Sequence, residues 1–231
     1  MQALLLILAL LAAPAYASWE PHWDGRETAI AAHQATAGAE SAMALGDSLT
    51  EQQAWWNTIA NCRVINAGFG GISTKAMVAR FANGQIPGSP RYVWLMIGTN
   101  TANIAVSETE FNQFSEHYLF ILRSLTQRGA RPILVSIPPV DKNKQSQFSQ
   151  ARINTMNSVI LAYARMYSFD FVNLNYDLMD LNPASATYGH ALPWVTQDDG
   201  VHLTATANRV LYQHQHASIT RQIAVTGRPC W

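Results

Sequence analysis

The stretch AMALGDSLTEQQ, residues 42–53, decides the fold class, because an apolar run passes into a polar one through Gly46, Asp47 and Ser48. A short, continuous apolar run is typical of a strand that is buried on both faces. Gly46 permits a sharp turn after that strand, and Asp47 can cap the helix that follows. The stretch therefore predicts that the Ser48 hydroxyl and N–H lie at a helix start, where unpaired donors favour an anion. Gly-Asp-Ser is also ordinary turn chemistry, so it does not assign a function alone.

Short apolar runs alternate with longer helical segments along the rest of the chain. Strands are expected at residues 41–45, 63–66, 91–97, 131–137 and 169–172, and helices at 26–37, 49–60, 74–82, 108–127, 148–166 and 204–224. The helix at 108–127 has the clearest three-and-four spacing of apolar residues, and Gly129 is placed to end it. This alternation predicts an α/β fold with a parallel sheet and helices on both faces. Ligands of such sheets bind beyond the carboxyl ends of the strands, where Ser48 is expected.

The composition fits one globular domain. Hydrophobic residues make up 48% of the 231 residues and charged residues 13%, which is enough apolar material for a full core. The 15 basic and 15 acidic side chains cancel, so no electrostatic feature favours nucleic acid or an anionic membrane surface as a partner.

The N-terminal residues have the pattern of a signal peptide. An apolar stretch over residues 4–11 precedes Ala15-Tyr16-Ala17, a small-x-small site at which signal peptidase would cut before Ser18. We therefore expect residues 1–17 to be removed and residues 18–231 to be a single exported domain, periplasmic or secreted. Because no Lys or Arg precedes the apolar stretch, an uncleaved anchor is the alternative, although the stretch is shorter than the roughly 20 residues that span a bilayer. No cysteine follows the cut, so a lipoprotein is not expected.

Cys62 and Cys230 are the two cysteines of the sequence. Export to an oxidising compartment favours a disulfide between them, which would tie the C-terminal tail to the domain. Closing so long a loop contributes at most roughly 5 kcal/mol in the chain-entropy model. Two buried or free thiols are the alternative.

Two polar turns follow later strands. NAGFGGIST, residues 66–74, is dense in glycine, which lets backbone amides approach a bound group closely. Its glycines lack the G-x-G-x-x-G spacing of a dinucleotide site. IGTNTAN, residues 97–103, places the Asn100 amide at the same edge of the sheet, although Asn is also common in turns.

Another polar turn, QDDGVHLT at residues 197–204, pairs a carboxylate with a histidine. Asp199 stands three residues before His202, and a carboxylate there can fix the tautomer of a general base and stabilise its protonated form. Asp198 competes for this role, and a lone histidine before a helix is often structural.

Together, the four segments resemble the SGNH or GDSL-type esterases and lipases. The matching residues, in the family's order, are Gly46-Asp47-Ser48-Leu49, Gly71, Gly98-Thr99-Asn100, Asp199 and His202. The resemblance implies a flavodoxin-like three-layer α/β/α sandwich with a five-stranded parallel sheet. It also implies serine ester hydrolysis without a metal or a cofactor.

The resemblance also implies a role for each matching residue. Ser48 is the nucleophile, His202 is the general base, and Asp199 orients His202. The oxyanion hole consists of the N–H groups of Ser48 and Gly71 and the side chain of Asn100. Family members often have an acidic residue directly after this glycine, where this chain has Ile72. We therefore expect packing, in place of a carboxylate, to hold the glycine turn.

The sequence says less about which ester is the substrate. No long apolar lid segment is present, which argues against a lipase that opens at an oil interface. The long connection at residues 174–198 leads to the catalytic turn, and long loops at this edge are usually functional. We expect Phe69, Tyr188 and Trp194 to line the substrate site, although such aromatic residues can equally pin a loop to the core.

These features favour a short-acyl esterase that removes acetyl groups from a small molecule or a polysaccharide. A lysophospholipase or thioesterase of the same fold is the alternative, with an acyltransferase or a glycan-binding module as candidates of other classes. Trp55 and Trp56 are expected in the core. His214 and His216, two apart on a helix, are better explained as solvated residues than as metal ligands.

Overall fold

The computed structural model describes residues 19–37, 41–53 and 58–230, and it contains one sheet of six strands in the order β2-β3-β1-β4-β5-β6. The strands are β1 (Ala42–Gly46), β2 (Thr58–Ile59), β3 (Cys62–Gly68), β4 (Tyr92–Met96), β5 (Arg131–Val135) and β6 (Asp170–Val172). All neighbours from β3 to β6 pair in parallel, which confirms the predicted five-stranded parallel sheet. The residues of β1 and β4 are all buried, as expected for strands covered on both faces.

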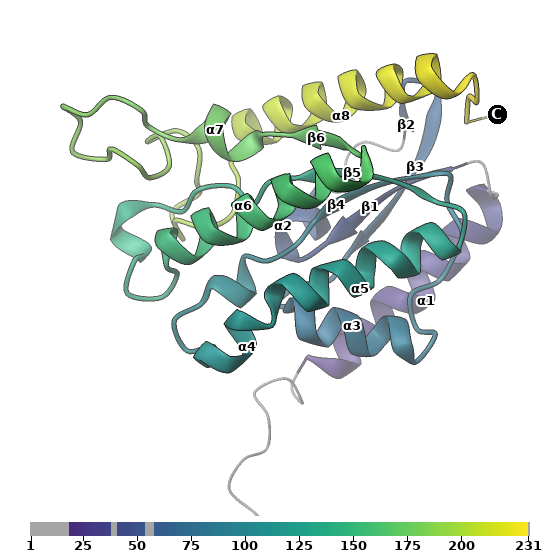
Figure 1. The fold of residues 1–231 in the computed structure, drawn as a ribbon, viewed down its shortest axis with the longest axis horizontal. Coiled ribbons are helices and arrows are strands. Elements are labelled where there is room, and N and C mark those ends of the chain that lie inside the picture. Colours follow the sequence, from purple (N-terminus) through teal and green to yellow (C-terminus); the bar gives the residue numbers. More distant parts are fainter. Residues whose placement is uncertain (1–18, 38–40, 54–57, 231) are drawn as a thin grey trace, which may run out of the picture.

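Helices cover both faces of this sheet (Figure 1). They are α1 (Glu20–Ala37), α2 (Ser48–Glu51), α3 (Thr74–Ala82), α4 (Glu108–Asn112), α5 (Phe114–Gln127), α6 (Gln150–Tyr167), α7 (Leu174–Leu178) and α8 (Ala205–Thr226). Apolar side chains of α1, α3, α5 and α6 pack against one face of the sheet, and those of α7 and α8 against the other. The fold is therefore the expected three-layer α/β/α arrangement.

The predicted helix at residues 49–60 is wrong at its C-terminal end, since α2 ends at Glu51 and residues 58–60 are not helical. Thr58 and Ile59 form β2, which pairs antiparallel with the start of β3. The two linking residues, Ala60 and Asn61, have φ of 48° and 65°, as a two-residue hairpin turn of type I′ requires. Trp55 and Trp56, expected in the core, lie outside the described residues.

Two other helices differ from the prediction. The helix expected at 108–127 is divided at Gln113 into α4 and α5, because the continuous buried stripe begins only at Phe114. Helix α1 begins at Glu20, before the expected start, and Pro21 fits its first turn because the N–H groups there have no helical partner. Within the described part of the chain, no helix has both the length and the apolar character needed to cross a bilayer. The expected signal segment, residues 1–17, lies outside that part.

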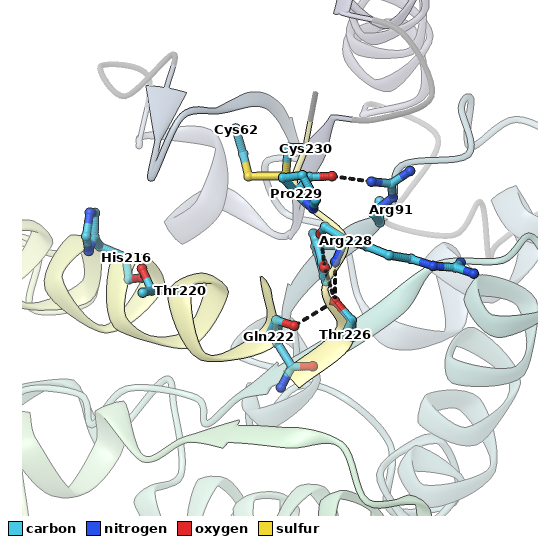
Figure 2. The surroundings of a disulfide bond; sticks show 10 residues. Cys62, Arg91, His216, Thr220, Gln222, Thr226, Arg228, Pro229 and Cys230 are labelled. Carbon is cyan, nitrogen blue, oxygen red and sulfur yellow. Dashed lines mark hydrogen bonds between the residues drawn. A yellow bond between two sulfur atoms is a disulfide. The ribbon is translucent and has the colours of Figure 1, made fainter. Parts of the chain in front are cut away.

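The C-terminal tail is held at the amino edge of the sheet (Figure 2). A disulfide joins Cys62, the first residue of β3, to Cys230, with an S–S distance of 2.03 Å. Beside it, the Tyr92 hydroxyl donates to the Arg228 carbonyl at 2.7 Å, and the Arg91 guanidinium donates to the Pro229 carbonyl. The tail after α8 is thus fixed at the edge opposite the turn that carries Ser48.

Candidate active site

Ser48 is the first residue of α2, directly after the turn that ends β1. A Cβ atom at Gly46 would lie 2.0 Å from the Met96 carbonyl oxygen, so the turn needs glycine at this position. Asp47 caps α2, since its Oδ1 accepts the Leu49 N–H at 3.1 Å. The strand, turn and helix predicted from the sequence are therefore present, with Ser48 at the carboxyl end of a central strand.

Asp47 also links the Ser48 turn to the next turn of the sheet edge. Its Oδ2 accepts the backbone N–H of Thr99 at 3.3 Å, and the Thr99 side chain hydrogen-bonds to it as well. The carboxyl group is fully buried, and burial raises its pKa to about 6 although the hydrogen bonds from Leu49 and Thr99 oppose the rise. Asp47 thereby sets the position of Asn100, the residue that follows Thr99.

His202 lies between Ser48 and Asp199. Its Nε2 is 2.9 Å from Ser48 Oγ, and its Nδ1 hydrogen-bonds to Asp199 Oδ2. The other carboxylate oxygen, Asp199 Oδ1, accepts the N–H groups of Val201 and His202, each at 2.9 Å. Asp199, and not Asp198, is therefore the carboxylate that fixes the imidazole.

The contacts of Asp199 also determine its ionisation. Burial raises the pKa of this carboxyl, but the hydrogen bonds from His202 and from the Val201 N–H together outweigh burial and lower the pKa below its ordinary value. Asp199 is consequently ionised at neutral pH, as a group that stabilises a protonated imidazole must be.

The glycine turn and Asn100 face Ser48 across an open hollow of about 370 Å³. Gly71 has φ of +71°, a conformation that favours glycine. Asn100 begins a short 3₁₀ turn and donates one Nδ2 hydrogen to the Ile72 carbonyl at 3.1 Å, which leaves its second hydrogen for a ligand. Ser48, Gly71, Asn100 and His202 all line this hollow. Three potential donors to an oxyanion thus surround the Ser48 hydroxyl.

The residues expected to bind substrate are not in this hollow. Phe69 is fully buried in the core between the sheet and its helices, so its assignment as a pocket wall is wrong. Tyr188 and Trp194 are 55% and 42% exposed and do not line the hollow at Ser48.

Other side chains, which the sequence analysis did not single out, form the wall of the hollow. They are Trp19 and His22 from the start of the chain's described part, Glu51 at the end of α2, and Gln52 directly after it. The Trp19 ring lies so close to the turn that a Cβ atom at Gly71 would be 3.1 Å from it. The position of Trp19 depends on how α1 packs against the domain. Residues 19–22 contain no sequence motif that would indicate this packing.

The expectation for Ile72 is half right. Ile72 is fully buried and packs in the core, but a carboxylate does hold the glycine turn. It comes from Glu51, whose Oε2 accepts the Gly70 N–H. Glu51 lies close to the turn in space but nineteen residues before Gly70 in the chain. The identity of the residue directly after Gly71 therefore could not indicate the role of Glu51.

The histidines of α8 have partners of their own. His214 Nε2 lies 2.9 Å from Asp177 Oδ2, and His216 contacts the ring of Tyr212. Among the residues that the structure describes, no group of three or more His, Cys, Asp or Glu side chains is arranged to hold a metal ion.

Comparison with known proteins places this chain in a family. The GDSL-like lipase/acylhydrolase family matches residues 36–210. A curated relative, the uncharacterized lipoprotein YqeF of Bacillus subtilis (strain 168), is 28% identical over 122 residues, which cover 45% of this chain. The match covers 50% of that lipoprotein, so this chain spans about half the length of the relative.

Solved structures share the fold at low sequence identity. An acetyl xylan esterase superposes with a TM-score of 0.64 at 19% identity, over 78% of this chain and 99% of that protein. A GDSL-like lipase from Bacteroides thetaiotaomicron VPI-5482 gives a TM-score of 0.65 at 18% identity, over 87% and 98% of the two chains. The lipase/acylhydrolase from Enterococcus faecalis gives 0.59 at 20% identity, over 79% and 94%.

Proposed function

Since this chain belongs to the GDSL-like lipase/acylhydrolase family, we propose that it is an exported esterase that cleaves short-acyl esters with Ser48, His202 and Asp199. The observation that carries this proposal is the 2.9 Å contact between Ser48 Oγ and His202 Nε2, with Asp199 bound to the opposite ring nitrogen. A serine hydroxyl becomes a nucleophile when an adjacent base accepts its proton and a third group orients that base.

In the first half of the reaction, Ser48 Oγ attacks the ester carbonyl while His202 Nε2 takes the hydroxyl proton. The negative charge moves to the carbonyl oxygen, which faces the N–H groups of Ser48 and Gly71 and the free hydrogen of the Asn100 amide. His202 then passes its proton to the leaving alcohol, and an acyl group remains on Ser48. In the second half, His202 takes a proton from water as the water oxygen attacks the acyl carbonyl. The bond between the acyl carbon and Ser48 Oγ then breaks, Oγ regains the proton from His202, and the carboxylic acid leaves.

A short acyl group is favoured by the shape of the site. The hollow is open, and the Trp19 ring stands against the Gly71 turn, which leaves little room on that side for a long acyl chain. An acetyl xylan esterase shares the fold, which supports an acetylated carbohydrate or a similar small ester as the substrate class.

Export is supported by two observations. The sequence begins with the pattern of a signal peptide, so the mature enzyme would be residues 18–231 in the periplasm or outside the cell. The disulfide between Cys62 and Cys230 suits an oxidising compartment. N-terminal sequencing of the exported protein should begin at Ser18, and a chain that starts at Met1 in the cytoplasm would contradict export.

The test of the function is a panel of acetyl to long-chain acyl esters and acetylated glycans, with wild type and Ser48→Ala side by side. We expect acetyl esters to be cleaved fastest and Ser48→Ala to lose roughly 10⁴-fold or more in kcat. A fluorophosphonate should label Ser48 in the wild type. Rates that rise with acyl-chain length would point to a lysophospholipase or thioesterase. Transfer of the acyl group to a sugar would point to an acyltransferase. A Ser48 that the fluorophosphonate does not label would point to a binding module without catalytic activity.

A further inference from the structure

The residue before the oxyanion donor, Gly70, is held on both sides. Its N–H donates to Glu51 Oε2, and its carbonyl accepts the indole N–H of Trp23 at 2.8 Å. Trp23 comes from α1 and is only 3% exposed, while Glu51 comes from the helix that Ser48 begins. Helices α1 and α2, which are far apart in the sequence, thus both hydrogen-bond to Gly70.

The Trp23 bond fixes the direction of the Gly71 N–H. The Gly70 carbonyl and the Gly71 N–H belong to one peptide unit, which is planar and, like every peptide bond in the described residues, not cis. In a trans peptide the C=O and the N–H point in opposite directions. Holding the Gly70 carbonyl toward Trp23 therefore directs the Gly71 N–H away from Trp23; Gly71 lines the hollow and Trp23 does not.

The Glu51 bond fixes the preceding peptide. Gly70 follows the end of β3, so its N–H has no strand partner and needs another acceptor. Glu51 supplies one, and its charge is balanced by the Arg26 guanidinium at 4.0 Å, while His22 Nε2 lies 3.1 Å from the same carboxylate. A negative charge so near an oxyanion site would otherwise oppose the reaction.

The frame around Glu51 is itself closely packed. The Asn66 side chain donates to the carbonyls of Thr50 and Glu51, and Arg26 donates to the carbonyls of Asn66 and Gly68. A Cβ atom at Gly68 would lie 2.0 Å from the Glu51 nitrogen. The end of β3, helix α2 and helix α1 therefore form one rigid support beneath the turn.

We propose that Trp23 and Glu51 are positioning residues that hold Gly70 from both sides and so aim the Gly71 N–H into the oxyanion hole. The inference rests on the proposed function, since Gly71 serves there as an oxyanion donor. Helix α1 then belongs to the catalytic apparatus, although none of its residues needs to touch the reacting atoms for this role.

The first test is Trp23→Phe, which keeps the aromatic packing and removes the indole N–H. Because the oxyanion forms only in the transition state, we expect kcat for an acetyl ester to fall about 10-fold or more while KM stays within about twofold. The control is Trp94→Phe, which removes an equally buried indole bond, to Ser218 on the other face of the sheet. It should leave kcat within about twofold of the wild type.

The second test separates the acceptor from the bulk of Glu51. Glu51→Ala should lower kcat about 10-fold or more, and Glu51→Gln, which keeps an oxygen for the Gly70 N–H, should restore most of the loss. The control, Asp170→Ala, removes a similarly buried carboxylate of β6 that pairs with Arg221 of α8, away from the turn. It should leave kcat unchanged while it costs a comparable amount of thermal stability.

An arm that needs no ester hydrolysis follows amide hydrogen exchange at Gly70, whose N–H is hydrogen-bonded to Glu51, by NMR. Exchange should speed up about 10-fold or more in Trp23→Phe and Glu51→Ala, and stay at the wild-type rate in both controls and in Glu51→Gln. If the wild type hydrolyses no ester, the proposed function fails and this arm still decides whether the two residues hold the turn. Wild-type exchange and kcat in Trp23→Phe and Glu51→Ala, or equal losses in the controls, would overturn the inference.

Discussion

The two edges of the parallel sheet are built from different interactions. At the carboxyl edge, β1 and β3 end in Gly46 and Gly68, where backbones approach too closely for any side chain, and a fully buried carboxyl group, Asp47, links two turns. At the amino edge, a disulfide joins Cys62 to Cys230. The close packing and the buried carboxyl group at the carboxyl edge thus lower the stability of the fold, and the disulfide at the amino edge raises it. Substitutions at the first edge should change rates, and substitutions at the second should change stability.

The largest effect is expected from His202→Ala at the carboxyl edge. Without the imidazole, Ser48 has no base and the leaving alcohol has no acid, so kcat should fall by roughly 10⁴-fold or more. The side chain is 23% exposed and at a loop, so the unfolding temperature should change little. Ester hydrolysis and thermal unfolding of the same preparation measure both; a large loss of stability would show that the edge is not specialised for rate.

Asn100→Ala should follow in size. Its amide is one of the proposed oxyanion donors, and removing one such donor typically costs about 3 to 4 kcal/mol, or 10²- to 10³-fold in kcat. The hydrogen bond to the Ile72 carbonyl is lost as well, so a modest fall in stability is expected. Steady-state kinetics on an acetyl ester should show the loss in kcat and not in KM; an unchanged kcat would remove Asn100 from the site.

The matching test at the amino edge is the double variant Cys62→Ser, Cys230→Ser. Releasing the tail should lower the free energy of unfolding by about 2 to 4 kcal/mol, which denaturant titration measures. Because the disulfide lies at the opposite edge from Ser48, kcat at 25 °C should equal that of the wild type. A parallel loss of kcat would mean that the two edges are coupled through the sheet.

Asp47 is the place where the carboxyl edge costs stability. Its pKa is raised to about 6 from 3.8, so between these values the folded protein holds a proton that the unfolded chain has released. The stability contributed by this group is therefore complete below about pH 4, falls as the pH rises to about 6, and levels off above, a loss of up to about 3 kcal/mol.

Comparison with Asp47→Asn isolates this effect from the other carboxylates. The variant should lack the decline between pH 4 and 6, so its free energy of unfolding relative to the wild type rises by up to about 3 kcal/mol over that range. The lost acceptor for the Thr99 N–H adds a constant offset that does not depend on pH. Urea titrations at several pH values measure the difference, and parallel pH curves for the two proteins would refute the assignment.

The sequence reveals the residues whose positions are set locally. Ser48, Asn100 and the pair Asp199 and His202 each follow a strand end or precede a helix cap, and the topology of a parallel sheet then brings these ends together. The hairpin at Ala60 and Asn61 is not evident from the sequence, because Ala60 rarely adopts a positive φ and Asn61 alone is a weak turn signal.

The residues that reach the site through the packing of helices could not be predicted in the same way. The bond between Glu51 and Gly70 depends on the packing of α2 against β3. Trp19, Trp23 and His22 reach the site only through the docking of a whole helix, and no local pattern encodes that contact. The residues that wall the hollow are therefore the least predictable part of the candidate site, whereas Ser48, His202 and Asp199 are the most predictable.

The wall formed by Trp19 supports the smallest expected effect. Trp19→Ala should open the hollow beside Gly71 and raise kcat/KM for butyryl relative to acetyl esters by about 10-fold, since room for one or two methylenes is worth that much in a pocket. Trp194→Ala is the matched control, an aromatic residue of similar exposure that does not line the hollow, and it should leave the ratio unchanged. If Trp194→Ala shifts the ratio and Trp19→Ala does not, the acyl group lies toward the 174–198 connection, and the aromatic loop, not α1, selects the ester.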